Sequence, residues 1–108
     1  MSPRGVQGDG HVEIRVRNSS TVDFDRVVVD FPDRARVDYG RVVKGADSEF
    51  QRTARAYRYA GIRITASGRE WALSPIDYVG EQPLSAGRYT YVIGLDGDRV
   101  TLTLERGH

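Results

Sequence analysis

The sequence predicts an all-β protein, a two-sheet antiparallel β-sandwich of seven to eight short strands. The first observation is the closing segment, where apolar and polar residues alternate over residues 88–95 and 100–105, on either side of Asp96-Gly97-Asp98. Alternation with period 2 about a Gly-centred turn is typical of two paired antiparallel strands. The second observation is that similar segments recur roughly every 8–12 residues with no convincing helix between them, which is typical of sandwiches.

The first half of the chain contains three predicted strands. Residues 11–18 alternate cleanly, and residues 18–21 (Asn-Ser-Ser-Thr) form a turn of side chains that hydrogen-bond to their own backbone. Residues 22–31 form the next strand, in which the apolar parity slips by one residue. We therefore expect a β-bulge near residues 25–26. A short strand and the pair Val-Val follow within residues 36–43.

Residues 48–58 fit two structures. An amphipathic helix is possible because apolar residues recur at i, i+4 and i+7. An extended strand is the alternative, and Thr53, Tyr57 and Tyr59 favour it because β-branched and aromatic residues suit a pleated surface. We favour the strand.

The next two segments are a hairpin and a long connection. Residues 60–66 and 70–75 pair about a turn at residues 67–69, and the alternation directs Trp71 inward. Residues 76–86 are rich in Pro and Gly, and connections of this length are either functional or fixed by their own packing. We favour a loop that closes the end of the sandwich over one that presents its side chains to a partner.

Length and charge indicate one domain with a mixed-charge surface. A chain of 108 residues is long enough for a single core, and we assign residues 11–106 to one β-sandwich domain after a flexible leader at residues 1–10. Sixteen basic residues stand against 15 acidic ones. A surface of mixed sign produces no net field that steers a polyanion, so we expect no nucleic-acid partner.

Two features of the sequence concern the location of the protein. No apolar run approaches the roughly 18 residues that cross a bilayer, so we expect no membrane span. Residues 1–10 lack the apolar stretch of a signal peptide. We expect an extracytoplasmic protein, in the periplasm or on the cell surface, if an export signal has been removed, and a cytoplasmic one otherwise.

Catalytic and metal-binding chemistry has little support. The chain has no cysteine, and its two histidines are His11 and His108, outside any metal-ligand spacing. Two acidic clusters could offer oxygen ligands to Ca²⁺, one at residues 23–30 and one at residues 96–98. We interpret the second as turn chemistry and the first as solvent-facing strand residues. We expect no metal site, no cofactor and no enzyme.

Aromatic residues are the best candidates for binding. Tyr57, Tyr59, Trp71 and Tyr78 could gather into a platform for a sugar or a protein, with Glu81 as a polar contact in the same loop as Tyr78. The alternative is that Trp71 belongs to the core and the tyrosines are half-buried edge residues.

Two segments carry a family resemblance. Ala56-Tyr-Arg-Tyr-Ala-Gly-Ile-Arg-Ile64 and Trp71 to Tyr91, with its Ile-Asp-Tyr-Val-Gly-Glu loop and Pro-Leu-x-x-Gly-x-Tyr-Thr-Tyr strand entry, resemble small exported bacterial domains of unknown function, often lipoproteins. The resemblance covers about residues 12–105. It implies an extracytoplasmic sandwich with immunoglobulin-like or prealbumin-like connectivity and no assigned catalysis. The lipid-anchoring cysteine of such lipoproteins is missing from this sequence.

Together these observations predict a non-catalytic β-sandwich module of the bacterial cell envelope that binds a protein or a glycan. One alternative is a structural or self-assembling surface domain, which requires a long, flat sheet edge without charge or proline. A less favoured alternative is a small hydrolase that uses Asp or Glu, which requires two carboxylates facing each other in a cleft.

Overall fold

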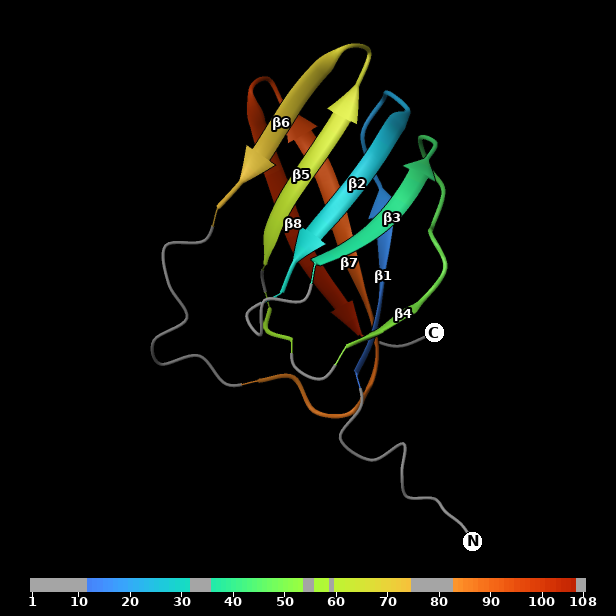
Figure 1. Cartoon of the computed structure of the whole chain (residues 1–108), viewed down its shortest axis with the longest axis vertical. Helices are drawn as coiled ribbons and strands as arrows, with labels where there is room; N and C mark the ends of the chain where they lie inside the picture. The colour runs from blue at the N-terminus through green and yellow to red at the C-terminus, as the bar shows by residue number, and fades with distance from the viewer. Residues whose placement is uncertain (1–11, 32–35, 54–55, 59, 75–82, 107–108) are drawn as a thin grey trace, which may run out of the picture.

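The strands of the protein follow the alternating segments of its sequence. The computed structural model describes residues 12–31, 36–53, 56–58, 60–74 and 83–106. This part of the chain is all-β, with eight strands and no helix (Figure 1). In chain order the strands are β1 (Val12–Asn18), β2 (Phe24–Asp30), β3 (Arg36–Val42), β4 (Gln51–Thr53), β5 (Gly61–Ala66), β6 (Arg69–Leu73), β7 (Gly87–Asp96) and β8 (Arg99–Arg106).

The strands form two four-stranded sheets that face each other (Figure 1). The first sheet has the order β4-β1-β7-β8, and the second has the order β3-β2-β5-β6. Neighbouring strands are antiparallel except β1 and β7, which run parallel from the pair Val12–Gly87 to the pair Asn18–Ile93. The prediction of a two-sheet β-sandwich is confirmed, and among the described strands β1–β7 is the one pair that departs from antiparallel pairing.

The strand order differs from that of a constant-type immunoglobulin sandwich, one of the two connectivities that the family resemblance implies. In a constant-type immunoglobulin sandwich the second strand pairs with the first and the fifth. Here β2 pairs with β3 and β5, and β1 lies in the opposite sheet. Prealbumin-like connectivity stays a prediction.

Both predicted hairpins are present. The β5–β6 turn has positive φ angles at Ser67 (51°) and Gly68 (76°), as a type I′ turn requires. The β7–β8 turn contains Gly97 at φ 63° and is closed by the pair Asp96–Arg99. Because both turns are two residues long, they fix the register of the strands that they join.

The predicted β-bulge lies in β2. Between Phe24 and Val27 the strand advances three residues while its partner β3 moves only from Val42 to Gly40. The extra residue lets Phe24 and Val27 both point into the core, although they differ in parity. The strand begins at Phe24 and not at Val22 as the sequence suggested, because residues 20–22 belong to the preceding turn.

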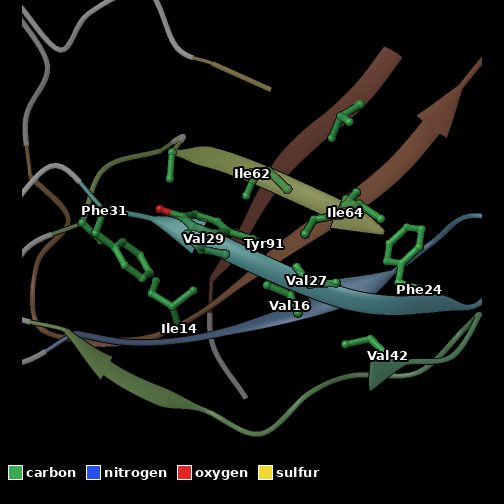
Figure 2. Packing of buried hydrophobic residues seen from close by; sticks show 14 of the residues in the cluster. Ile14, Val16, Phe24, Val27, Val29, Phe31, Val42, Ile62, Ile64 and Tyr91 are labelled. Carbon is green, nitrogen blue, oxygen red and sulfur yellow. The ribbon is translucent and has the colours of Figure 1, made fainter. Parts of the chain in front are cut away.

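The core fills the space between the sheets (Figure 2). The ring of Phe31 stacks on Tyr91 with the centroids 6.3 Å apart. The Tyr39 hydroxyl of β3 donates to the Ile14 carbonyl of β1 at 2.8 Å and so links the two sheets. The largest fully buried apolar side chains are Tyr91, Phe24, Ile14, Ile62, Ile64, Ile93, Val16, Val27 and Val29.

The ambiguous stretch at residues 48–58 contains a short strand in its described part. Gln51–Thr53 forms β4 and pairs with β1, and Thr53 is buried. The Ser48 amide donates to the Val16 carbonyl at 2.8 Å. The strand interpretation is therefore confirmed for β4.

A cluster of charges fastens the β3–β4 connection to β1. Arg17 donates from Nε to Asp47 Oδ1 at 2.7 Å and from Nη2 to Oδ2 at 3.3 Å, and Arg15 Nη1 lies 3.4 Å from the same Oδ2. The hydrogen bonds from Arg17 are the main cause that holds the pKa of the Asp47 carboxyl below its usual value. Two donors on one carboxylate make this the most constrained ion pair of the connection.

We predict that Asp47→Asn lowers the free energy of unfolding by about 1 kcal/mol at pH 7. Because the pKa of Asp47 is lower in the folded state than in the unfolded one, its contribution is present above the unfolded pKa of about 3.9. The contribution is lost as the pH falls through the folded pKa. Urea unfolding from pH 7 down to pH 2 should therefore show the variant and wild type converging. Glu49→Gln, at an exposed position nearby, is the control and should follow wild type throughout.

Candidate binding pocket at the turn end of the sandwich

A pocket of about 460 Å³ opens at the end of the sandwich where three turns meet. These are the β1–β2 turn and the two hairpins, β5–β6 and β7–β8, which lie together at the top of Figure 1. Both sheets thus contribute to its wall. The lining residues are Ser19, Ser20, Thr21, Val22, Ala66, Ser67, Arg69, Trp71, Leu95 and Gly97.

Asn18 organises the β1–β2 turn that forms one side of this pocket, which we call the turn-end pocket. Its side chain is fully buried, at 0 % exposure. The amide nitrogen donates to the carbonyls of Val22 (2.8 Å) and Val42 (2.9 Å), and Oδ1 accepts from Ser20 N (2.9 Å) and Oγ (2.6 Å). All four bonding positions of a primary amide are therefore used. The predicted turn of backbone-bonding side chains is confirmed, with Asn18 as its centre.

The same turn is fastened to β7. Ser19 donates from both N (2.9 Å) and Oγ (3.0 Å) to the Ile93 carbonyl. Gly94 leaves the room for this contact, because a Cβ there would lie 3.1 Å from Ser19 Oγ and 2.7 Å from Thr101 Oγ1. The turn therefore packs closely on the first sheet, and the wall that it provides is well supported.

Trp71 forms the opposite wall. Its indole Nε1 donates to the Gly97 carbonyl at 3.2 Å, which joins the two hairpins across the sheets. The Arg69 guanidinium lies 4.6 Å from the indole centroid and donates to Asp98 at 2.9 Å. One face of the indole is thus covered by a cation, an arrangement that is stabilising over tryptophan. The side chain is only 9 % exposed.

The acidic cluster beside this end has structural partners. Arg41 bridges Asp25 (3.1 Å) and Asp23 (3.4 Å). Asp23 also accepts from the Lys44 amide at 3.0 Å, and Asp25 accepts from the Ser67 amide at 3.2 Å. These carboxylates fasten neighbouring turns to β2. Within the described ranges, no three His, Cys, Asp or Glu side chains gather in a way that could hold a metal ion.

A smaller hollow of about 170 Å³ lies on the outer face of the second sheet. Arginines line it, but each faces a carboxylate: Arg26 pairs with Asp38 at 2.8 Å, and Arg36 and Arg63 approach Asp30 at 2.7 and 3.8 Å. Its positive charge is compensated, so the turn-end pocket is the stronger candidate site.

The structure places the residues predicted from the sequence at different ends of the molecule. Trp71 pairs with Ile64 beside the β5–β6 turn, whereas Tyr57 precedes β5 and its carbonyl accepts from the Tyr91 hydroxyl at 2.6 Å. Trp71 and Tyr57 therefore do not lie together. Tyr59, Tyr78 and Glu81 lie outside the described residues, so their roles stay predictions.

Sequence reasoning missed most of the pocket. Val22 was expected at the start of a strand, but it lies in the turn and is 37 % exposed. Val43 is 41 % exposed and follows β3 at the same end. The signal that could have indicated Val22 is its position directly after the polar stretch at residues 18–21, on the far side of the bulge from the apolar run Val27–Val29.

Comparison with known proteins supports the fold. No family model matches the chain, and no curated protein matches it. A protein from Eubacterium rectale, solved by NMR, is similar over 99 % of this chain and 98 % of its own, with a TM-score of 0.66 and 14 % identity. A protein described as a putative cell adhesion protein from Bacteroides uniformis is similar over 91 % of this chain, with a TM-score of 0.54 and 10 % identity.

The second likeness is partial, since this chain spans half of the Bacteroides protein. In the part of the chain that the structure describes, no helix is long and apolar enough to cross a membrane. Because both identities are low, the likeness to the two solved structures concerns the fold alone. The chain shares its fold with these bacterial proteins.

Proposed function

We propose that this chain is a non-catalytic module of the bacterial cell envelope that binds a protein partner through the turn-end pocket. The observation that carries the proposal is the pocket itself, about 460 Å³ between three supported turns. Cavities of this size with apolar walls and a few polar groups are typical binding sites. The likeness to a putative cell adhesion protein supports an extracytoplasmic role.

The chemistry of the walls favours an apolar side chain of a protein as the occupant. Val22 and Leu95 provide apolar surface, and Ser20 and Ser67 provide hydroxyl groups at the rim. Buried apolar anchors with a polar surround are typical of protein interfaces. A sugar that stacks on Trp71 is less favoured, because Arg69 covers one face of the indole and the side chain is 9 % exposed.

The proposal of a non-catalytic role rests on the state of the carboxylates. A hydrolase needs one carboxyl with a raised pKa facing a second across a cleft. Three carboxylates at this end of the sandwich are instead paired with arginine: Asp23 and Asp25 with Arg41, and Asp98 with Arg69. These ion pairs give the carboxylates a structural role at the turns.

We predict that Val22→Asp weakens partner binding at least tenfold and leaves the fold intact. The side chain is 37 % exposed, so a charge there stays hydrated in the free protein but would be desolvated against an apolar anchor. Peptides selected from a random displayed library against wild type should lose at least tenfold in affinity for the variant, about 1.4 kcal/mol or more.

The matched control for this change is Gln51→Asp. It adds the same charge at an exposed position of β4, at the other end of the sandwich, and should keep wild-type affinity. Peptides that bind Val22→Asp as tightly as wild type would contradict the pocket. So would a glycan array that yields sugar ligands whose binding is unaffected by Val22→Asp.

The envelope location has an independent test. Antibody against the purified domain should detect the native protein in the periplasmic or surface fraction of the source bacterium. Detection only in the cytoplasmic fraction would contradict the proposed envelope location and would leave the proposed binding site unaffected.

A further inference from the structure

The edge strand β8 differs from the other sheet edges of the described structure. β4 has three residues, β6 has five, and β3 carries register shifts and alternating charges. β8 has eight residues and pairs with β7 over its whole length without a shift. Natural proteins protect edges with short strands, bulges, charges or proline, and the centre of β8, Thr101 to Leu104, has none of these.

The backbone of β8 presents a regular row of groups on its outer side. In an antiparallel ladder, successive residues direct their N–H and C=O groups alternately to one side and the other. The turn is closed at Arg99, which therefore faces β7 together with every second residue after it. The backbone groups of Val100, Leu102 and Leu104 face outward, and among the described residues no strand lies beyond them.

We propose that β8 pairs antiparallel with β8 of a second copy of this chain, about a two-fold axis at Leu102. The first sheets of the two copies then form one eight-stranded sheet. This proposal rests on the edge strand alone and is independent of the turn-end pocket. In this register Leu102 faces its own copy, Val100 faces Leu104, and the outward backbone groups oppose one another.

The side chains fit this register on both faces. On the outer face Thr101 lies opposite Thr103, and Arg99 lies opposite Glu105 at both ends of the interface. Threonine pairs and opposite charges directly across two strands are stabilising. A shift by two residues in either direction places Arg99 opposite Thr103, or Glu105 opposite Thr101, and both charge pairs are lost. The sequence of β8 is therefore complementary to itself in one register.

The groups concerned are accessible in the single chain. The Glu105 side chain is 55 % exposed and uses one oxygen for Arg17 at 3.1 Å, which leaves acceptor positions for a second arginine. Leu102 and Leu104 are half-buried, so strand pairing covers apolar surface as well. A single strand pair is smaller than a standard interface, so we expect a reversible dimer of micromolar affinity or weaker.

Charge exchange tests the register. In sedimentation equilibrium the wild type should show a reversible monomer–dimer equilibrium. Arg99→Glu and Glu105→Arg should each weaken dimerisation at least tenfold, because each puts like charges opposite one another at both ends. The double variant Arg99→Glu/Glu105→Arg should recover wild-type association. Circular dichroism of each variant should match that of wild type, which separates a loss of dimer from a loss of fold.

Disulfide trapping tests the axis. Because the chain has no cysteine, Leu102→Cys should form an intermolecular disulfide on mild oxidation, and Leu104→Cys should not. Paired Cα atoms at the axis lie about 5.5 Å apart, within disulfide range, whereas residues 104 face residues 100 and lie too far from each other. A wild type that stays monomeric at millimolar concentration, a dimer insensitive to the charge changes, or equal crosslinking of both cysteines would overturn the proposal.

Discussion

Replacing Asn18 with alanine is expected to lower the free energy of unfolding by about 3 kcal/mol. The amide makes four hydrogen bonds at a fully buried position, and two of them hold the carbonyls of Val22 and Val42. Removing a buried donor leaves its acceptor without compensation from water, which is more costly than the loss of an exposed bond. Urea denaturation followed by circular dichroism measures the change.

Two further variants separate the hydrogen bonds from the volume of the side chain. Asn18→Leu keeps a side chain of similar size and should be about as destabilising as alanine, because the donors are still missing. Ser20→Ala removes bonds at a partly exposed position and should lower stability by about 1 kcal/mol or less. An Asn18→Leu protein as stable as wild type would show that the amide network is not what holds the turn.

Trp71→Ala is expected to lower the free energy of unfolding by about 3–5 kcal/mol. The indole is 9 % exposed, packs against the core and donates to Gly97 across the two sheets. Trp71→Phe keeps most of the apolar contact and loses the Nε1 bond, so it should cost only about 1–2 kcal/mol. If the free energy of unfolding of Trp71→Ala lies within about 1 kcal/mol of the wild-type value, the indole does not belong to the core. That result would favour the interpretation of Trp71 as part of an aromatic binding platform.

The elements that the sequence predicts well are those with local causes. The two-residue turns Ser67-Gly68 and Gly97-Asp98 join strands that are adjacent in the chain, so alternation and turn residues specify the pairing together. The bulge was visible as a slip of apolar parity between Phe24 and Val27. In each case the evidence lies within about ten residues.

The parallel pair β1–β7 has no such local cause. Val12 meets Gly87 across 75 positions of sequence, and no turn connects the two strands. Their pairing depends on how both sheets pack over the shared core, and the alternation of β1 is the same for either direction of its neighbour. The direction of that pairing could not be read from the pattern.

The turn-end pocket was hidden for the same reason. Val22, Ser67 and Gly97 are each turn residues with an ordinary local explanation, and only the fold brings them to one end of the molecule. Trp71 is the lining residue that the sequence did indicate as a binding candidate, because it is the single tryptophan of the chain. Because the indole is buried and Arg69 covers one of its faces, Trp71 forms part of the pocket wall and not an exposed binding platform.

The indole N–H of Trp71 offers the sharpest test of the pocket as the binding surface. The chain has one tryptophan, so its indole gives one resolved signal in a ¹H–¹⁵N correlation spectrum, and its donor bond to Gly97 lies at the pocket wall. On titration with a selected peptide, we predict that this signal shifts together with the amides of Ser20, Thr21 and Ser67, while β4 is unchanged. Shifts confined to β8 or to the outer sheet faces, with an unmoved indole signal, would contradict the turn-end pocket as the binding site.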